Sequence, residues 1–156
     1  MILVSACLLG VNCRYDGTNN KNLELIKLLS EKNIFPVCPE ELGELTTPRP
    51  PAEIQGREVL EKKGRVMNTD GQDVTEAFIK GAEETLKLAE ENGVTTAILK
   101  ARSPSCGSGK IYDGSFTGTL TEGDGVTAAL LKRKNIKVYT EENFLESITE
   151  IENLDN

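Results

Sequence analysis

Four short runs of β-branched and aliphatic residues constrain the fold of this chain more than any other feature. They lie at residues 2–6, 34–37, 95–99 and 136–139. Each run is nearly continuously apolar, which is typical of strands that are buried on both faces of a sheet. The runs therefore predict a central sheet that is covered by other elements on both sides.

Segments with helical periodicity separate these runs. Helices are predicted over residues 22–33, 74–92, 126–134 and 141–152. The second is the clearest, because Asp73 and Glu76 resemble a capping box and Gly93 is a typical helix stop. Strands that alternate with helices predict an α/β fold with a mainly parallel, Rossmann-like sheet and right-handed crossovers.

Residues 41–72 interrupt this alternation. The stretch TTPRPPAE, residues 46–53, is too rich in proline to form a helix interior. The stretch REVLEKKGRVMN, residues 57–68, predicts a small β-hairpin that turns at residues 62–64. We expect a proline-rich loop and a hairpin inserted into a single α/β domain over residues 1–156, since about 150 residues is usual for one domain.

Charge and composition narrow the class of partner. A formal net charge of -7 opposes attraction to phosphate backbones, so nucleic acid is not expected. No apolar run approaches the ~20 residues that cross a bilayer, and the N-terminal LVSAC lacks the basic region of a leader. We expect a cytoplasmic protein that acts on a small molecule, and in a reducing compartment its cysteines favour metal binding or catalysis over disulfides.

Three of the four cysteines follow predicted strands. Cys7, Cys38 and Cys106 each come at or just after the end of an apolar run. Ligands of open α/β sheets bind beyond the carboxyl ends of the strands, where these cysteines would meet. The alternative is that each is only a small buried hydrophobe. Because three predicted strands are each followed by a cysteine, we favour the interpretation that the three thiols form one site.

The chain contains no histidine, which restricts the chemistry of such a site. Imidazole ligands and imidazole bases are excluded, so thiolates and carboxylates remain. Three thiolates can hold a cuboidal iron–sulfur cluster with one iron open to a substrate. Structural zinc usually has four ligands, and Cys13 would be the fourth. The cysteine spacing alone does not choose between iron–sulfur and zinc.

Four ordered motifs resemble the thiouracil desulfurases, a family long catalogued as a domain of unknown function. The motifs are SACLLG with RYDG, VCPEELGELTTPRPPAEI, KARSPSCGSG and GDGVTAALLKRK, and the resemblance extends from residue 2 to about residue 140. It implies a 4Fe-4S cluster and two catalytic side chains. The implied residues are the ligands Cys7, Cys38 and Cys106 and the catalytic Glu40 and Ser103. Cys13 has no motif position, and we interpret it as a bystander.

The resemblance implies that oxygen replaces the sulfur of 2-thiouracil or a related thiolated pyrimidine, without net redox change. Glu40 is the natural base for the attacking water in a chain without histidine, although a solvated carboxylate is the commoner fate of glutamate. Ser103 would hydrogen-bond the substrate, although SPS is also typical of an ordinary turn. Two rivals are a non-catalytic iron–sulfur or metal-binding carrier or sensor and a metal-free enzyme with a thiolate nucleophile.

Overall fold

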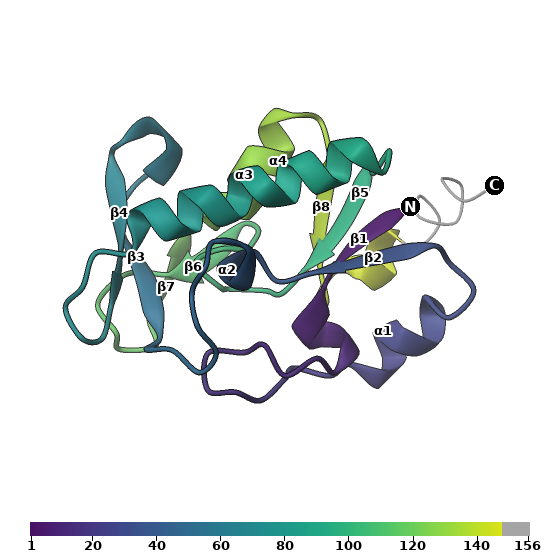
Figure 1. Cartoon of the computed structure of the whole chain (residues 1–156), viewed down its shortest axis with the longest axis horizontal. Coiled ribbons are helices and arrows are strands. Elements are labelled where there is room, and N and C mark those ends of the chain that lie inside the picture. The colour runs from purple at the N-terminus through teal and green to yellow at the C-terminus, as the bar shows by residue number, and fades with distance from the viewer. Residues whose placement is uncertain (148–156) are drawn as a thin grey trace.

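The computed structural model describes residues 1–147 and shows an α/β architecture built on a parallel sheet (Figure 1). Within those residues, the sheet contains β1 (Ile2–Ser5), β2 (Ile34–Val37), β5 (Thr96–Leu99) and β8 (Lys137–Thr140), in the order β2-β1-β5-β8. Each neighbouring pair runs parallel. The central strands β1 and β5 are buried along their whole length, as their continuous apolar pattern predicts. The predicted α/β class is confirmed.

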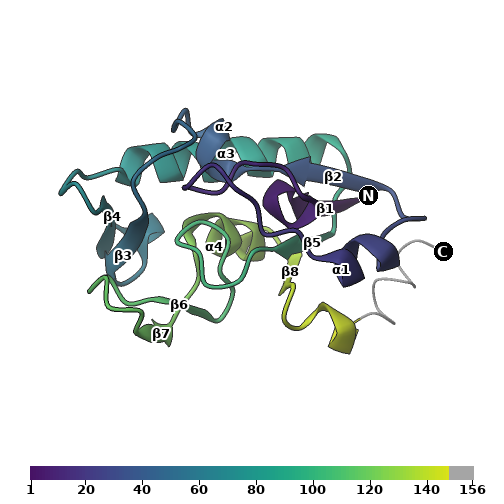
Figure 2. The same cartoon turned by 90° about the horizontal axis from the view of Figure 1, so that it is seen from below.

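Helices cover both faces of this sheet (Figures 1 and 2). On one face lie α3 (Thr75–Glu91) and α4 (Val126–Arg133). On the other lie α1 (Leu23–Leu28) and two 3-10 turns, η1 (Ala6–Leu9) and η3 (Phe144–Ser147). None of the helices in the described part of the chain combines the length and the apolarity that a bilayer crossing requires.

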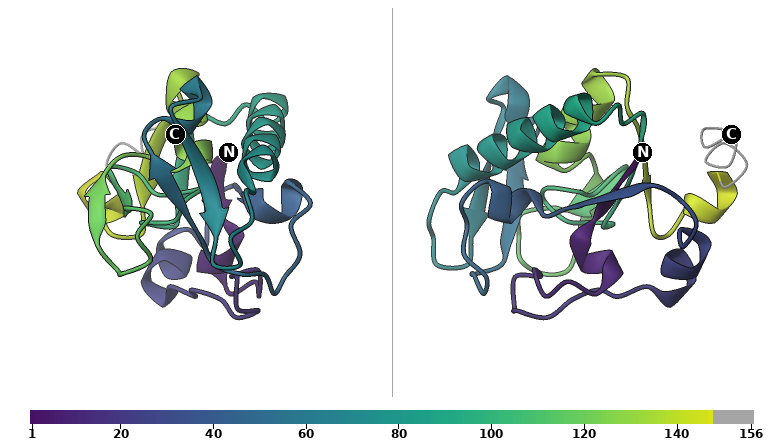
Figure 3. Two further views of the ribbon diagram at one scale, coloured as in Figure 1. Left: turned by 90° about the vertical axis from the view of Figure 1, so that its left-hand side faces the viewer. Right: turned by 45° about the vertical axis from the view of Figure 1, so that its right-hand side comes forward.

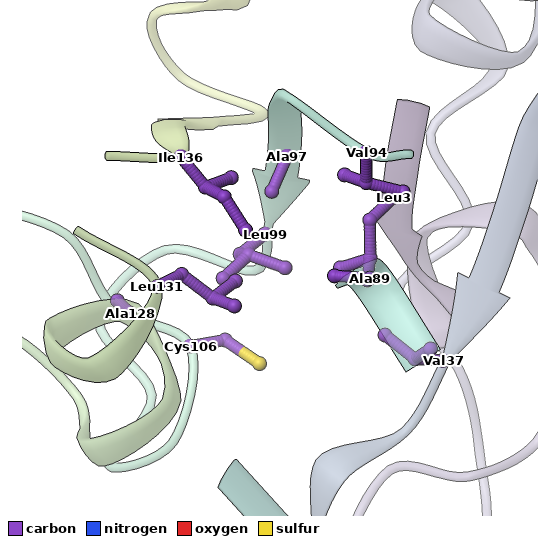
Figure 4. Close-up of a cluster of buried hydrophobic side chains, with 10 residues drawn as sticks. All are labelled: Leu3, Val37, Ala89, Val94, Ala97, Leu99, Cys106, Ala128, Leu131 and Ile136. Carbon is purple, nitrogen blue, oxygen red and sulfur yellow. The ribbon is translucent and has the colours of Figure 1, made fainter. Parts of the chain in front are cut away.

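The side chains of β1 alternate between the two faces. Leu3 packs into the cluster formed with α3 and α4, which Figure 4 shows in close-up. Ile2 and Val4 pack into the cluster on the side of α1. Successive side chains of a strand point to opposite faces, so one short strand anchors both layers and fixes where its carboxyl end lies.

Two of the predicted helices differ from the structure. α1 ends at Leu28 rather than near residue 33, and the Ser30 hydroxyl donates to the carbonyl of Lys27 at 2.9 Å, a local bond that competes with helix continuation. The last predicted helix begins instead as a turn followed by η3. Its predicted continuation over residues 148–152 lies outside the described residues.

Two antiparallel hairpins lie beyond the carboxyl edge of the sheet (Figure 3). In the first, β3 (Ala52–Gly56) pairs with β4 (Gly64–Asn68), so the predicted first strand was wrong. The first strand begins earlier than predicted because the chain is already extended when it leaves the prolines, which places Ile54 opposite Val66 in the core. Val59–Glu61, which was predicted to belong to that strand, forms a 3-10 turn instead. The second hairpin, β6 (Lys110–Tyr112) with β7 (Leu120–Glu122), was not predicted, since three-residue strands are too short to show alternation.

A single helical turn, α2 (Pro39–Leu42), packs backbone to backbone against α3. A β-carbon built on Gly81 of α3 would lie 2.0 Å from the carbonyl oxygen of Pro39, and Gly43 makes an equally close approach from the other side. Cys38 is the N-cap residue of α2. The glycine contact therefore holds in place the turn that carries Cys38.

We expect Gly81→Ala to destabilise the protein by about 1–3 kcal/mol, the usual cost of overpacking. Alanine is the better helix former by about 1 kcal/mol, but the clash with the Pro39 carbonyl exceeds that gain. The free energy of unfolding is measured by urea titration. Lys87→Ala, on the exposed side of the same helix, is the control and should leave the midpoint nearly unchanged. An unchanged midpoint for Gly81→Ala would show that the two helices separate without cost.

Candidate active site

A cavity of about 610 Å³ lies at the carboxyl edge of the parallel sheet. Its walls come from the segments that follow β1, β2 and β5, from the β3–β4 hairpin and from the β6–β7 hairpin. The volume is within the range of roughly 300–1,000 Å³ that small-molecule sites occupy. The cavity brings together all the site residues that the sequence predicted, which are Cys7, Cys38, Glu40, Ser103 and Cys106.

The three predicted thiols reach the cavity from three different strand ends. Cys7 lies in η1 directly after β1, and Cys38 caps α2 directly after β2. Both are half-buried. Cys106 is buried at the edge of the core cluster beside Leu131, with its sulfur pointing away from α4 (Figure 4). Burial, followed by the charge of Glu40, raises the pKa of the Cys106 thiol well above its usual range.

Cys13 is a fourth thiol of this site, which sequence reasoning had set aside as a bystander. Its side chain is buried, and it hydrogen-bonds the thiols of Cys38 and Cys7. These bonds raise the pKa of Cys13, lower that of Cys38, and lower that of Cys7 to about 7. The Cys13 carbonyl also accepts from the Cys38 thiol at 3.8 Å and from Arg49 at 2.9 Å. The structure thus places Cys13 in contact with two of the three predicted ligands.

The carboxylate of Glu40 is held at both oxygens. Its Oε2 forms an ion pair of 3.1 Å with the guanidinium of Arg49, whose side chain is only 8% exposed. Its Oε1 accepts a hydrogen bond from the Ser105 hydroxyl. Arg49 also donates to the Thr47 hydroxyl at 2.9 Å, so the proline-rich loop supports the carboxylate. Glu40 therefore points into the cavity in a fixed orientation rather than into solvent.

Ser103 organises the loop that carries Cys106. Its Oγ accepts from the backbone N–H groups of Cys106 at 2.7 Å and Ser105 at 3.2 Å, which is a serine turn of the kind the SPS sequence indicates. Ser105, which is buried, is the serine that contacts Glu40. The Oγ atoms of the two serines lie 3.1 Å apart, so Ser103 reaches the carboxylate through its neighbour.

More cations than carboxylates line the cavity, although the chain as a whole is acidic. Among the described residues, the cations that line it are Arg14, Arg49, Lys100 and Arg102. The carboxylates that line it are Glu40 and Glu53. Each of these cations forms an ion pair with a carboxylate. The pairs are Arg14 with Asp16, Arg49 with Glu40, Lys100 with Glu141 and Arg102 with Glu142.

Two partly exposed aromatic side chains, Tyr15 and Phe116, line the cavity. Phe116 belongs to the loop between β6 and β7 and has a φ of 58°. The Oε1 atom of Glu53 accepts from the backbone N–H groups of Gly114 at 3.0 Å and Phe116 at 3.2 Å, which fixes this loop. The guanidinium of Arg14 lies over the Tyr15 ring, 5.1 Å from its centroid, so it covers one face of that ring.

Comparison with known proteins identifies this arrangement. A family model described as 2-thiouracil desulfurase matches residues 2–143. The chain belongs to the 2-thiouracil desulfurase family. The resemblance seen in the four motifs is thereby confirmed.

Two proteins similar to this member of the desulfurase family extend the comparison. The uncharacterized protein YbbK of Bacillus subtilis (strain 168) is 47% identical over 144 residues, which cover 90% of this chain and 95% of YbbK. The solved structure of TudS, described as a 4Fe-4S-dependent thiouracil desulfidase, is 44% identical with a TM-score of 0.86 and covers 97% of each chain.

Sequence reasoning missed three side chains of this desulfurase-family site. They are Cys13, Arg49 and Ser105. Arg49 stands between prolines in TTPRPP, a position that suggested only a rigid loop. Ser105 precedes Cys106 directly, and that proximity to a predicted ligand was the signal available for it. Cys13 offered a weaker signal, since it lies between two motifs that both contribute to the cavity.

Proposed function

We propose that the protein removes the sulfur of 2-thiouracil or a related thiolated pyrimidine, with water as the source of oxygen, at a 4Fe-4S cluster held by Cys7, Cys38 and Cys106. The observation that carries the proposal is that these thiols and the Glu40 carboxylate line one cavity in a member of the 2-thiouracil desulfurase family. The similarity to the 4Fe-4S-dependent TudS supports the cofactor.

The donor set of the cavity fits such a cluster. Thiolates are the usual ligands of iron–sulfur centres, and here three of them come from separate strand ends at one sheet edge. Arg49 and Lys100 line the same cavity and would offset the negative charge of a thiolate-bound cluster. When bound through three cysteines, the cluster supplies an iron without a protein ligand, which is a Lewis acid for thiocarbonyl sulfur.

Glu40 is placed to take the proton of the attacking water. A carboxylate has about four lone-pair sites, and Arg49 and Ser105 each occupy one. The remaining sites can accept a hydrogen bond from water, and the two fixed partners prevent the side chain from turning away. The reaction balances without an oxidant or reductant, because one thiocarbonyl and one water give one carbonyl and one hydrogen sulfide.

The pyrimidine ring would lie against the polar side chains of the cavity. The Ser103 oxygen accepts two backbone N–H groups and lies 3.1 Å from the Ser105 Oγ, so its O–H would have to turn away from Ser105 to donate to a ring atom. Asn20 and Asn68 also line the cavity and offer amide donors and acceptors for the ring edges. The cavity volume and its mixture of apolar and polar walls suit a free base or a nucleoside of this class.

The test is sulfide release under anaerobic conditions. Protein reconstituted with iron and sulfide, then freed of excess reagent, is incubated with 2-thiouracil, and sulfide and uracil are measured together. We expect both products in equal amounts over many turnovers, and none from cluster-free protein. A cluster-replete protein that releases neither product from 2-thiouracil or related thiolated pyrimidines would overturn the proposal. That result would favour an iron–sulfur or metal-binding carrier, with Cys13 as a fourth thiol of its site.

A further inference from the structure

A second set of metal-binding atoms lies beside the proposed cluster ligands. The Sγ atoms of Cys13 and Cys38 and a carboxylate oxygen of Glu41 all lie within 4.8 Å of one another. The proposed function uses only Cys38 of these three. Glu41 does not line the cavity, and it faces the thiols from the exposed side.

The backbone fixes this arrangement. Cys38 caps α2, and Glu40 and Glu41 occupy its first turn, so their side chains leave the helix in different directions. Glu40 turns to Arg49 and Ser105, whereas Glu41 accepts a hydrogen bond from the Thr47 hydroxyl at 2.7 Å. Although Glu40 and Glu41 are consecutive in sequence, the first carboxylate therefore faces the cavity and the second faces the proline-rich loop.

Two thiolates and a carboxylate form a donor set that suits zinc. Zn–S bonds of about 2.3 Å and Zn–O bonds of about 2.0–2.2 Å place tetrahedral ligand atoms roughly 3.4–3.8 Å apart. Ligand atoms within 4.8 Å of one another reach that geometry by small side-chain rotations. The exposed Glu41 provides an entry path from solvent, while the buried Cys13 and half-buried Cys38 lie behind it.

We propose that the cluster-free protein binds one zinc ion through Cys13, Cys38 and Glu41, with water as the fourth ligand. The ion and the proposed cluster exclude each other, because Cys38 is a ligand in both. This second statement rests on the proposed function, whereas the zinc site itself does not.

The test is a metal titration of the reduced, cluster-free full chain. Zinc affinity is measured against a chromophoric chelator, and cobalt(II) serves as the spectroscopic probe for tetrahedral thiolate ligation. We expect one ion per chain and a loss of affinity of at least about tenfold in Cys13→Ser, since even outer-shell changes cost that much. Glu41→Gln, an exposed change that leaves the fold intact, should weaken binding as well.

Cys106→Ser is the matched control, because Cys106 belongs to the proposed cluster set and not to the zinc set. It should bind zinc with the wild-type affinity and fail to assemble the cluster, whereas Cys13→Ser should assemble the cluster and lose zinc. Unchanged zinc affinity in both Cys13→Ser and Glu41→Gln would overturn the proposal. Loss of zinc from Cys106→Ser would also overturn it, since the ion would then use the cluster ligands.

The exclusion has its own measurement. Wild-type protein loaded with one zinc ion should take up iron and sulfide more slowly than zinc-free protein, and Cys13→Ser treated in the same way should show no delay. Equal rates in wild-type protein with and without zinc would overturn the exclusion. If no variant and no wild-type sample assembles a cluster, the proposed function fails while the zinc titration still decides the zinc site.

Discussion

Replacing Cys7, Cys38 or Cys106 by alanine, one at a time, is expected to abolish the cluster and with it sulfide release. Each thiol reaches the cavity from a different strand end, and a cluster held by three cysteines loses a ligand with each change. The iron and sulfide content per chain after anaerobic reconstitution should fall to background, and turnover of 2-thiouracil should fall with it.

Two controls separate loss of ligation from loss of fold. Ser108→Ala changes the same loop as Cys106→Ala without removing a thiol, and it should retain iron and sulfide. Cys106 also packs in the core, so circular dichroism and a urea titration of Cys106→Ala should show a folded protein with only a small loss of stability. A folded Cys106→Ala protein with a full complement of iron and sulfide would remove Cys106 from the ligand set.

The location of the site could be predicted because it depends on local patterns and one rule of topology. Continuous apolar runs identified β1, β2 and β5, and the residues after them had to meet at the carboxyl edge of a parallel sheet. Cys7, Cys38 and Cys106 therefore converge on the cavity as expected. The family resemblance implied Glu40, the absence of histidine made a carboxylate the natural base, and the structure places Glu40 in the same cavity.

Contacts between loops could not be predicted in this way. Cys13 reaches Cys7 and Cys38 because the loop after β1 folds back, with the N–H of Asn20 donating to the carbonyl of Cys7 at 2.9 Å. Arg49 then fixes that loop from a segment that is distant in sequence. Such contacts carry no periodicity, and a turn signal such as SPS does not say which of its serines faces a neighbour.

Cys38 is a ligand in both the proposed iron–sulfur cluster and the proposed zinc site. Cys38 is the cap of a helical turn whose backbone contacts α3 directly, so its backbone is fixed while its sulfur can serve either ligand set. The choice between cluster and zinc is then made by its neighbours, Cys7 and Cys106 across the cavity or Cys13 and Glu41 on the exposed side. This division predicts that variants on one side affect one metal and spare the other.

Glu40→Gln is expected to lower turnover on the order of a hundredfold to ten-thousandfold, the usual cost of losing a positioned general base. The fold and the cluster should remain, because glutamine has nearly the same shape and the thiols are untouched. Arg49 keeps its acceptors at Thr47 and at the Cys13 carbonyl, so the loops around the cavity stay in place. Single-turnover sulfide release, with iron content checked for each sample, is the measurement.

Glu44→Gln is the matched control for this variant, since Glu44 follows the same helical turn but is exposed and pairs with Lys80 on the surface. Its release rate should equal that of the wild type. If cluster-replete Glu40→Gln also releases sulfide at the wild-type rate, Glu40 is not the base. The water would then have to lose its proton to another cavity group, and the Arg49 and Ser105 bonds to Glu40 would be structural supports of the ligand loops rather than of the chemistry.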